Sequence, residues 1–286
     1  MFSFITGIVN NDILVAFFYL LIITRSVELI TVSKFTLKLA LVDGLPLGVA
    51  TLVKPQLFIG FVVYMSAIII KRAPIKFAVT VLTLALLVSL TWYLRQFGLE
   101  GTTMVNYAVQ NIQSTPESMW HYPLEFFRGK QHIGIFMSFW GFFGWLDVPM
   151  HQSIYLLFVL FISLGLFGLW QKRKLLIQAF LQAKSYWLLV IAFVSYGLGI
   201  IAFDLQSFML SHRFLIQGRY FAPILPIFMT FLIYGIFIVD KKFRETFKTL
   251  SVIIFVLVQI LMVMTISRAY YGNYIPQFPL FQVYTL

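Results

Sequence analysis

Long apolar runs, separated by short clusters of charged residues, dominate the chain. A helix needs about 20 mainly apolar residues to cross the hydrocarbon core of a bilayer. Five runs approach this length: Phe77–Leu94, Ile154–Trp170, Trp187–Phe203, Phe221–Val239 and Leu250–Ile266. A shorter run at Ile13–Thr24, extended by apolar residues in Met1–Val9, predicts a further membrane helix.

The apolar stretch Leu39–Ile70 departs from this pattern because prolines interrupt it. It contains Asp43-Gly44-Leu45-Pro46 near its start and Lys54-Pro55 in its middle. Proline removes a backbone donor and disfavours helix at the residue before it. We therefore predict two short helices, at about 39–53 and 56–70, that meet at Lys54-Pro55. The pattern as a whole predicts an all-α, polytopic transmembrane helical bundle, with about eight membrane segments in one domain (1–286).

The basic residues alternate between the two sides of this predicted bundle. One set of loops carries 14 of the 21 Lys and Arg residues: Arg25, Lys34, Lys38, Lys71, Arg72, Lys76, Lys172, Arg173, Lys174, Lys184, Lys241, Lys242, Arg244 and Lys248. The alternation requires Leu39–Ile70 to cross twice, which agrees with the predicted hairpin. Cytoplasmic loops are enriched in Lys and Arg. The long loop Arg95–Gln152, the loop Asp204–Tyr220 and the tail Ser267–Leu286 are then predicted to be exoplasmic.

Composition excludes a water-soluble enzyme. Hydrophobic residues make up 60% of the chain and charged residues only 11%, whereas soluble domains carry about 25% charged residues. The net charge of +11 follows from the cytoplasmic loops, so it indicates membrane lipids as partners and not nucleic acid. The chain has no Cys, and its four His residues lack the close spacing of metal ligands. We therefore predict neither a metal nor another cofactor.

Asp147 is the candidate carboxylate. It lies in the Gly- and aromatic-rich stretch Ile133–Met150, which is too interrupted for an ordinary span and too apolar for a free loop. We interpret this stretch as an interfacial or re-entrant segment. A carboxylate at that level is costly unless it is paired, so we assign Asp147 a functional role. Trp145 belongs either to an aromatic belt or to the site.

Three further clusters offer groups that could bind an anion. Gln217, Arg219 and Tyr220 stand at the mouth of a helix, where Arg219 suits phosphate or carboxylate or anchors the helix at the headgroups. Lys54, at the tip of the hairpin, either contacts a lipid-linked phosphate or extends to the headgroups. Asn11 and Asp12 open the first helix, where Asp12 caps free amides or faces the site.

These clusters also resemble a known family. The runs Gln217–Pro226 and Phe143–Pro149, together with Asn11-Asp12 and Gly48–Pro55, are similar to pieces of the bacterial "domain of unknown function 2142" membrane proteins. The likeness covers nearly the whole chain. The Asn-Asp opening and the Lys-tipped hairpin are also similar to features of C-fold (GT-C) glycosyltransferases, which use polyprenyl-phosphate-linked sugars at the exoplasmic face.

The resemblance implies a glycosyltransferase-like protein of the bacterial plasma membrane. Asp147 would then orient or deprotonate an acceptor hydroxyl, and Lys54 or Arg219 would stabilise a phosphate leaving group. C-fold transferases carry their catalytic acid upstream of such an Asn-Asp helix, and the nine residues before Asn10 include no acidic one. We therefore expect the C-terminal portion of a longer architecture. The alternatives are a lipid-linked glycan transporter component and a non-catalytic scaffold that binds glycan assembly proteins.

Overall fold

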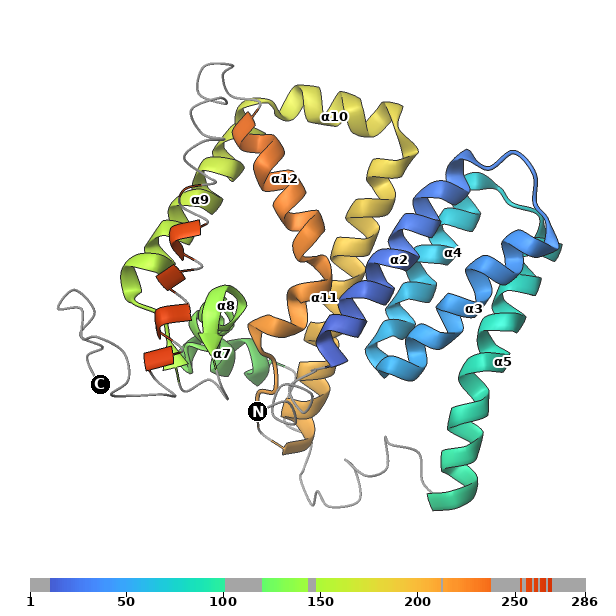
Figure 1. Cartoon of the computed structure of the whole chain (residues 1–286), viewed down its shortest axis with the longest axis horizontal. Coiled ribbons are helices and arrows are strands. Elements are labelled where there is room, and N and C mark those ends of the chain that lie inside the picture. Colours follow the sequence, from blue (N-terminus) through green and yellow to red (C-terminus); the bar gives the residue numbers. More distant parts are fainter. Residues whose placement is uncertain are drawn as a thin grey trace. The chain divides into compact units, whose positions relative to one another are not determined.

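The computed structural model shows a helical chain (Figure 1). It describes residues 11–100, 120–143, 148–211 and 213–237, and the positions 253, 256–258, 260–261, 263–265 and 267–268. Within these residues the strands are a single antiparallel pair of two residues each, β1 (Phe142–Phe143) and β2 (Val148–Pro149), with Phe142 opposite Pro149. The prediction of an all-α protein is therefore confirmed at the level of class.

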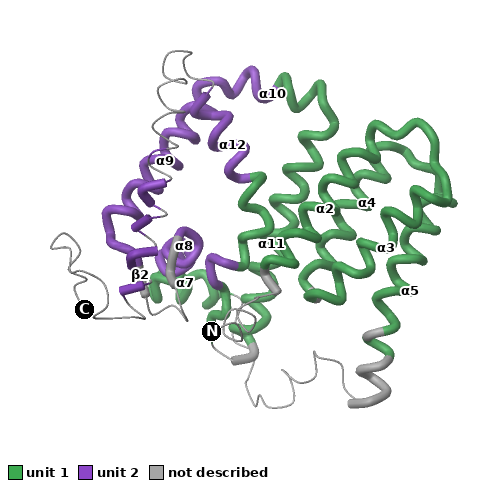
Figure 2. Tube along the Cα trace, viewed as in Figure 1, with its two compact units in different colours: residues 1–131, 178–216, 220–227 green, residues 132–177, 217–219, 228–286 purple. Residues whose placement is uncertain are grey.

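The chain divides into two compact units (Figure 2). The first comprises Met1–Gln131, Gln178–Ile216 and Tyr220–Ile227, and the second comprises His132–Ile177, Gln217–Arg219 and Phe228–Leu286.

The first unit is built around four helices from the N-terminal third of the chain: α2 (Asn11–Thr31), α3 (Leu37–Val53), α4 (Ile59–Lys71) and α5 (Ile75–Glu100). Helix α3 packs along α5, while α2 packs against both α3 and α4 (Figure 1). The long helix α11 (Lys184–Ser211) contacts α2 and α4. Buried apolar side chains fill these contacts, among them Tyr19, Leu47, Tyr64, Val81 and Leu188.

Close approach of α3 to α5 depends on a small residue. A Cβ atom added to Gly48 would lie 2.6 Å from the carbonyl oxygen of Ala85 on α5. Small residues at helix interfaces allow this kind of packing, which is common between membrane helices. Buried Thr51, one turn further along, bonds to buried Ser89 across the same interface, with their hydroxyl oxygens 2.7 Å apart.

The predicted break in the hairpin is confirmed. Helix α3 ends at Val53, and Lys54 has an extended backbone with φ −161° and ψ 133°. Pro55 opens the short 3-10 helix η1 (Pro55–Phe58), which leads into α4. At the other end of the hairpin, Thr36 caps α3 by accepting a hydrogen bond from the amide of Leu39.

The second unit contains α9 (Gln152–Gln171) and most of α8 (Gln131–Gly141) and α12 (Leu225–Phe237). The 3-10 helix η2 (Gly218–Ile224) precedes α12, and its first two residues belong to this unit. Met150, Ile154, Tyr155 and Val258 form a small buried cluster, against which Phe136, Met137 and Trp140 of α8 pack. Trp140 stacks on Phe158 of α9 with ring centroids 4.2 Å apart.

Four helices among the described residues are long and apolar enough to cross a membrane: Ile13–Thr31, Gln152–Gln171, Lys184–Met209 and Gly218–Phe237. Two shorter apolar helical stretches are Gln56–Lys71, which covers most of η1 and all of α4, and Ile75–Thr91, which is part of α5. These assignments follow from length and composition. The chain is therefore a membrane protein, and the predicted total of about eight segments stays a prediction.

The structure places helices in several segments that were predicted as loops, and α5 continues to Glu100, past the predicted start of a loop at Arg95. Helix α11 continues to Ser211, so Asp204 lies within a helix and does not begin a loop. Helices α7 (His121–Arg128) and α10 (Arg173–Gln182) form in segments predicted as loops. These two helices are short and polar at their ends, so their apolar residues did not form a run long enough to be recognised as a membrane segment.

Candidate functional site

Lys54 and Tyr220 come together in the first unit. The Lys54 ammonium nitrogen lies 4.8 Å from the centroid of the Tyr220 ring, within the range of a cation–π interaction. Both side chains are half-buried. The extended backbone at Lys54 takes its side chain out of the helical pattern of α3, and Tyr220 comes from η2. Two of the residues predicted as anion-binding groups therefore share one place in the fold.

Polar side chains continue from Lys54 into the hairpin and the neighbouring helices. The Gln56 amide donates to the Tyr196 hydroxyl of α11 at 3.3 Å. The Tyr93 hydroxyl of α5 donates to the Thr51 carbonyl oxygen at 3.4 Å. The end of the hairpin therefore carries a charged group and hydrogen-bonding groups next to apolar helices.

Asp204 fixes the chain that leads to Tyr220. Its carboxylate is fully buried, and its Oδ1 accepts the amides of Leu215 at 2.6 Å and Ile216 at 2.8 Å. The Tyr122 hydroxyl of α7 donates to Oδ2 at 2.8 Å. A buried carboxylate is stable only when donors of this kind surround it. Burial, and then the hydrogen bond to Asp204, raise the pKa of the Tyr122 phenol. Asp204 is therefore a positioning residue.

In the second unit, Gly218 packs directly on α8. Its amide donates to the Ser138 hydroxyl at 2.7 Å. A Cβ atom at this position would lie 2.0 Å from the amide nitrogen of Phe139 and 2.2 Å from the carbonyl oxygen of Ile135. No side chain fits there, so glycine at this position allows the backbone of η2 to lie directly against the backbone of α8.

The residues on either side of Gly218 carry buried polar atoms. Gln217 Oε1 is withdrawn from solvent and accepts no hydrogen bond within the described part of the chain. The Nε atom of Arg219 is also buried, and the Arg219 side chain as a whole is half-buried. Buried amide oxygens normally accept a hydrogen bond, so Gln217 is suited to receive one from a ligand.

The other predicted residues cannot be placed as side chains. Trp145 and Asp147 lie outside the described residues. Asn11 and Asp12 lie in the first turn of α2, and their side chains are outside the described part. Across the described ranges, no group of three or more His, Cys, Asp or Glu side chains could hold a metal ion.

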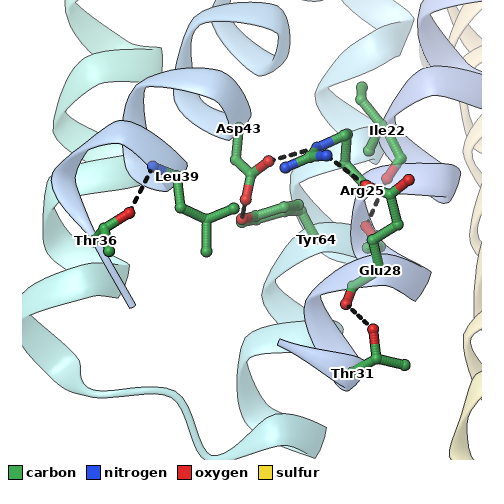
Figure 3. A network of polar contacts seen from close by, with 9 residues as sticks. Ile22, Arg25, Glu28, Thr31, Thr36, Leu39, Asp43 and Tyr64 are labelled. Carbon is green, nitrogen blue, oxygen red and sulfur yellow. Dashed lines mark hydrogen bonds and ion pairs between the residues drawn. The ribbon is translucent and has the colours of Figure 1, made fainter. Parts of the chain in front are cut away.

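Sequence reasoning missed a buried ionic network in the first unit, formed by Arg25, Asp43 and Tyr64 (Figure 3). Arg25 Nε donates to Asp43 Oδ1 at 2.7 Å, and the Tyr64 hydroxyl donates to Oδ2. Asp43 is buried, whereas Glu28, which pairs with the same arginine, is half exposed. Arg25 was predicted in a loop but lies within α2. The signal that could have revealed this network is an acidic residue inside one apolar stretch and a basic residue directly after the neighbouring one, because charges at membrane depth must pair.

The fold and these contacts define a helical membrane protein with a polar, cationic hairpin end. The chain belongs to the family described as "Predicted membrane protein (DUF2142)", whose sequence pattern matches residues 1–228. Searches of curated proteins and of solved structures found no match.

Proposed function

We propose that this protein binds a polyprenyl-phosphate-linked sugar at the end of the hairpin and takes part in transferring that sugar at the exoplasmic face. The observation that carries the proposal is the approach of the Lys54 ammonium to the Tyr220 ring at 4.8 Å. A cation held against an aromatic ring, next to apolar helices, suits a ligand that has a phosphate attached to a long hydrocarbon chain.

Lys54 has the chemistry to bind and stabilise the phosphate. In glycosyl transfer from a polyprenyl phosphate, the bond between sugar and phosphate breaks and the phosphate leaves with additional negative charge. A fixed ammonium stabilises that charge, and more strongly where water is excluded. Arg219, next to Tyr220 in the sequence, offers a second cation with a planar set of donors. Asp147 is proposed to orient the acceptor hydroxyl, with Trp145, Gln217, Asn11 and Asp12 as further contacts.

The proposal includes a topology of about eight membrane segments in a bacterial plasma membrane. Helices at all of the described predicted segments support it, as does the alternation of basic loops. The hairpin end and Tyr220 then lie on the exoplasmic side, where polyprenyl-linked sugars are used. Lipids and proteins of glycan assembly are the proposed partners.

Sugar transfer by the protein itself tests the activity. The full chain in lipid nanodiscs would be incubated with radiolabelled polyprenyl-phosphate sugars and a membrane extract that lacks the protein. We expect time-dependent release of polyprenyl phosphate, and its loss in Arg219→Ala and Asp147→Asn proteins that remain folded. Normal release in both variants would reject these two site residues. Binding of the carrier without any release would favour the scaffold function.

A further inference from the structure

The short helix α7 has one side packed onto the end of α11. Tyr122 is buried there, with its ring 5.6 Å from Phe208 of α11 and 5.5 Å from Phe214. Its hydroxyl bonds to the buried Asp204 carboxylate at 2.8 Å. Asp204 lies in the last two turns of Lys184–Met209, a helix long and apolar enough to span a membrane. These contacts hold α7 at the level where that helix ends.

A different side of α7 exposes large apolar groups. The residues Trp120, Leu124 and Phe127 are 84%, 50% and 63% exposed. They are spaced by four and then three residues, so they share one face of the helix. Soluble proteins rarely expose a contiguous apolar patch of this kind, and such patches mark sites that contact a membrane or a partner.

Polar residues occupy the remaining side of the helix. His121 and Glu125 are exposed, and Arg128 Nη1 lies 3.7 Å from Glu125 Oε1 with both side chains in contact with solvent. Lys130 follows directly and is also exposed. The helix therefore has three sides: one packed on the protein, one apolar and exposed, and one polar with two cations nearby.

We propose that the Trp120–Leu124–Phe127 face lies in the interfacial layer of the membrane, on the side where α11 ends. The depth follows from the Tyr122–Asp204 bond, which ties α7 to the last turns of a spanning helix. The composition agrees, because Trp and Phe partition into the headgroup region while Arg and Lys reach phosphates there. The bilayer surface lies at the level where a spanning helix ends, so the position of α7 by itself accounts for contact with lipid. Contact with a protein partner would not follow from that position. The proposal does not depend on glycosyl transfer.

The absence of Cys from the sequence makes the test direct. Single Leu124→Cys and Phe127→Cys variants of the full chain would carry a nitroxide spin label in vesicles of zwitterionic and anionic lipid. His121→Cys and Glu125→Cys variants on the polar side are the matched controls. The measurement compares collisions of each label with oxygen, which concentrates in lipid, and with a water-soluble nickel complex.

We expect labels at 124 and 127 to favour oxygen, and labels at 121 and 125 to favour the nickel complex. None of the four positions is buried, so the substitutions remove no core contact, and either apolar position can stand for the other if one variant is poorly folded. Equal access of the nickel complex to both sides would overturn the proposal. So would labels at 124 and 127 that neither reagent reaches, because protein would then cover the face.

Discussion

The ammonium of Lys54 lies 4.8 Å from the centre of the Tyr220 ring, although the two residues are far apart in the sequence. Pro55 follows Lys54 and begins η1, so α3 ends before it. Asp204 binds the backbone amides of Leu215 and Ile216, in the segment that leads to Tyr220. The break after α3 positions Lys54, and the buried Asp204 carboxylate of α11 positions the segment that precedes Tyr220. This convergence is the basis of the proposed phosphate site.

The ring of Tyr220, more than its hydroxyl, should hold the ammonium. Tyr220→Phe keeps the aromatic face and should bind polyprenyl phosphate within about twofold of the unmodified protein, because the cation–π contact remains. Tyr220→Leu should weaken binding by about fivefold, the equivalent of about 1 kcal/mol. Isothermal titration of the nanodisc-embedded chain measures both. Equal losses in the two variants would show that the ring face has no part in binding.

Gly218 should tolerate no side chain. Gly218→Ala places a methyl group within 2.2 Å of two backbone atoms of α8, and backbone atoms cannot move aside as a flexible side chain can. We expect a lower midpoint of thermal unfolding in detergent. Gly134→Ala, within α8 itself, is the matched control, because a Cβ at Gly134 meets nothing within 4 Å. That variant should be neutral or stabilising by up to about 1 kcal/mol. A neutral Gly218→Ala would contradict the close packing of η2 on α8.

The Arg25–Asp43 pair should contribute strongly to the stability of the first unit. Asp43→Ala leaves the Arg25 guanidinium beside apolar helices without its buried partner, and breaking a buried pair costs about 3–5 kcal/mol. Glu28→Ala removes the half-exposed partner of the same arginine, at a cost of about 1 kcal/mol or less. Thermal unfolding of the two variants in matched detergent gives the comparison. Equal losses of stability in the two variants would mean that the burial of Asp43 does not strengthen its contribution to the stability of the first unit.

Stability should depend on the titration of Tyr122 at alkaline pH. Burial and the bond to Asp204 raise the pKa of its phenol in the folded protein, so folding favours the protonated form. The contribution is fully present below the unfolded pKa of about 10 and is lost as pH rises toward the folded value. Tyr122→Phe should therefore be less stable than the unmodified protein at pH 8, by about 1.5–3 kcal/mol for one buried hydrogen bond to a charged group.

The same variant should lose less stability between pH 9 and 11. Tyr186→Phe, an exposed tyrosine of α11, serves as its control and should follow the unmodified protein throughout. Parallel alkaline unfolding curves for Tyr122→Phe and the unmodified protein would refute the link between Tyr122 and Asp204.

Local chemistry explains which parts of the fold could be predicted from the sequence. The hairpin followed from Lys54-Pro55, because the effect of proline on the preceding residue does not depend on tertiary structure. Helix α7 forms in a segment predicted as a loop, although the segment contains Pro123. This proline lies in the first turn, where the backbone amides have no partner within the helix and proline is tolerated.

The candidate site was less accessible from the sequence because it depends on how helices are rotated and aligned. Lys54 and Tyr220 were each recognised as groups near a helix end, but no pattern in either segment indicates that they meet. Asp204 was assigned to a loop, although its function depends on hydrogen bonds to Tyr122, Leu215 and Ile216. Asp43 was noted only as part of a helix-breaking run, and its pairing with Arg25 required the packing of α2 on α3.

The affinity of the Lys54→Ala protein for polyprenyl monophosphate tests the central claim most directly. The matched control is Lys34→Ala, which removes the same charge from an exposed position between α2 and α3. Loss of one charged hydrogen bond to a phosphate should weaken binding by about tenfold, or about 1.4 kcal/mol, in Lys54→Ala. Lys34→Ala should bind as the unmodified protein does. Unchanged binding in Lys54→Ala, or an equal loss in both variants, would contradict a phosphate site at the end of the hairpin.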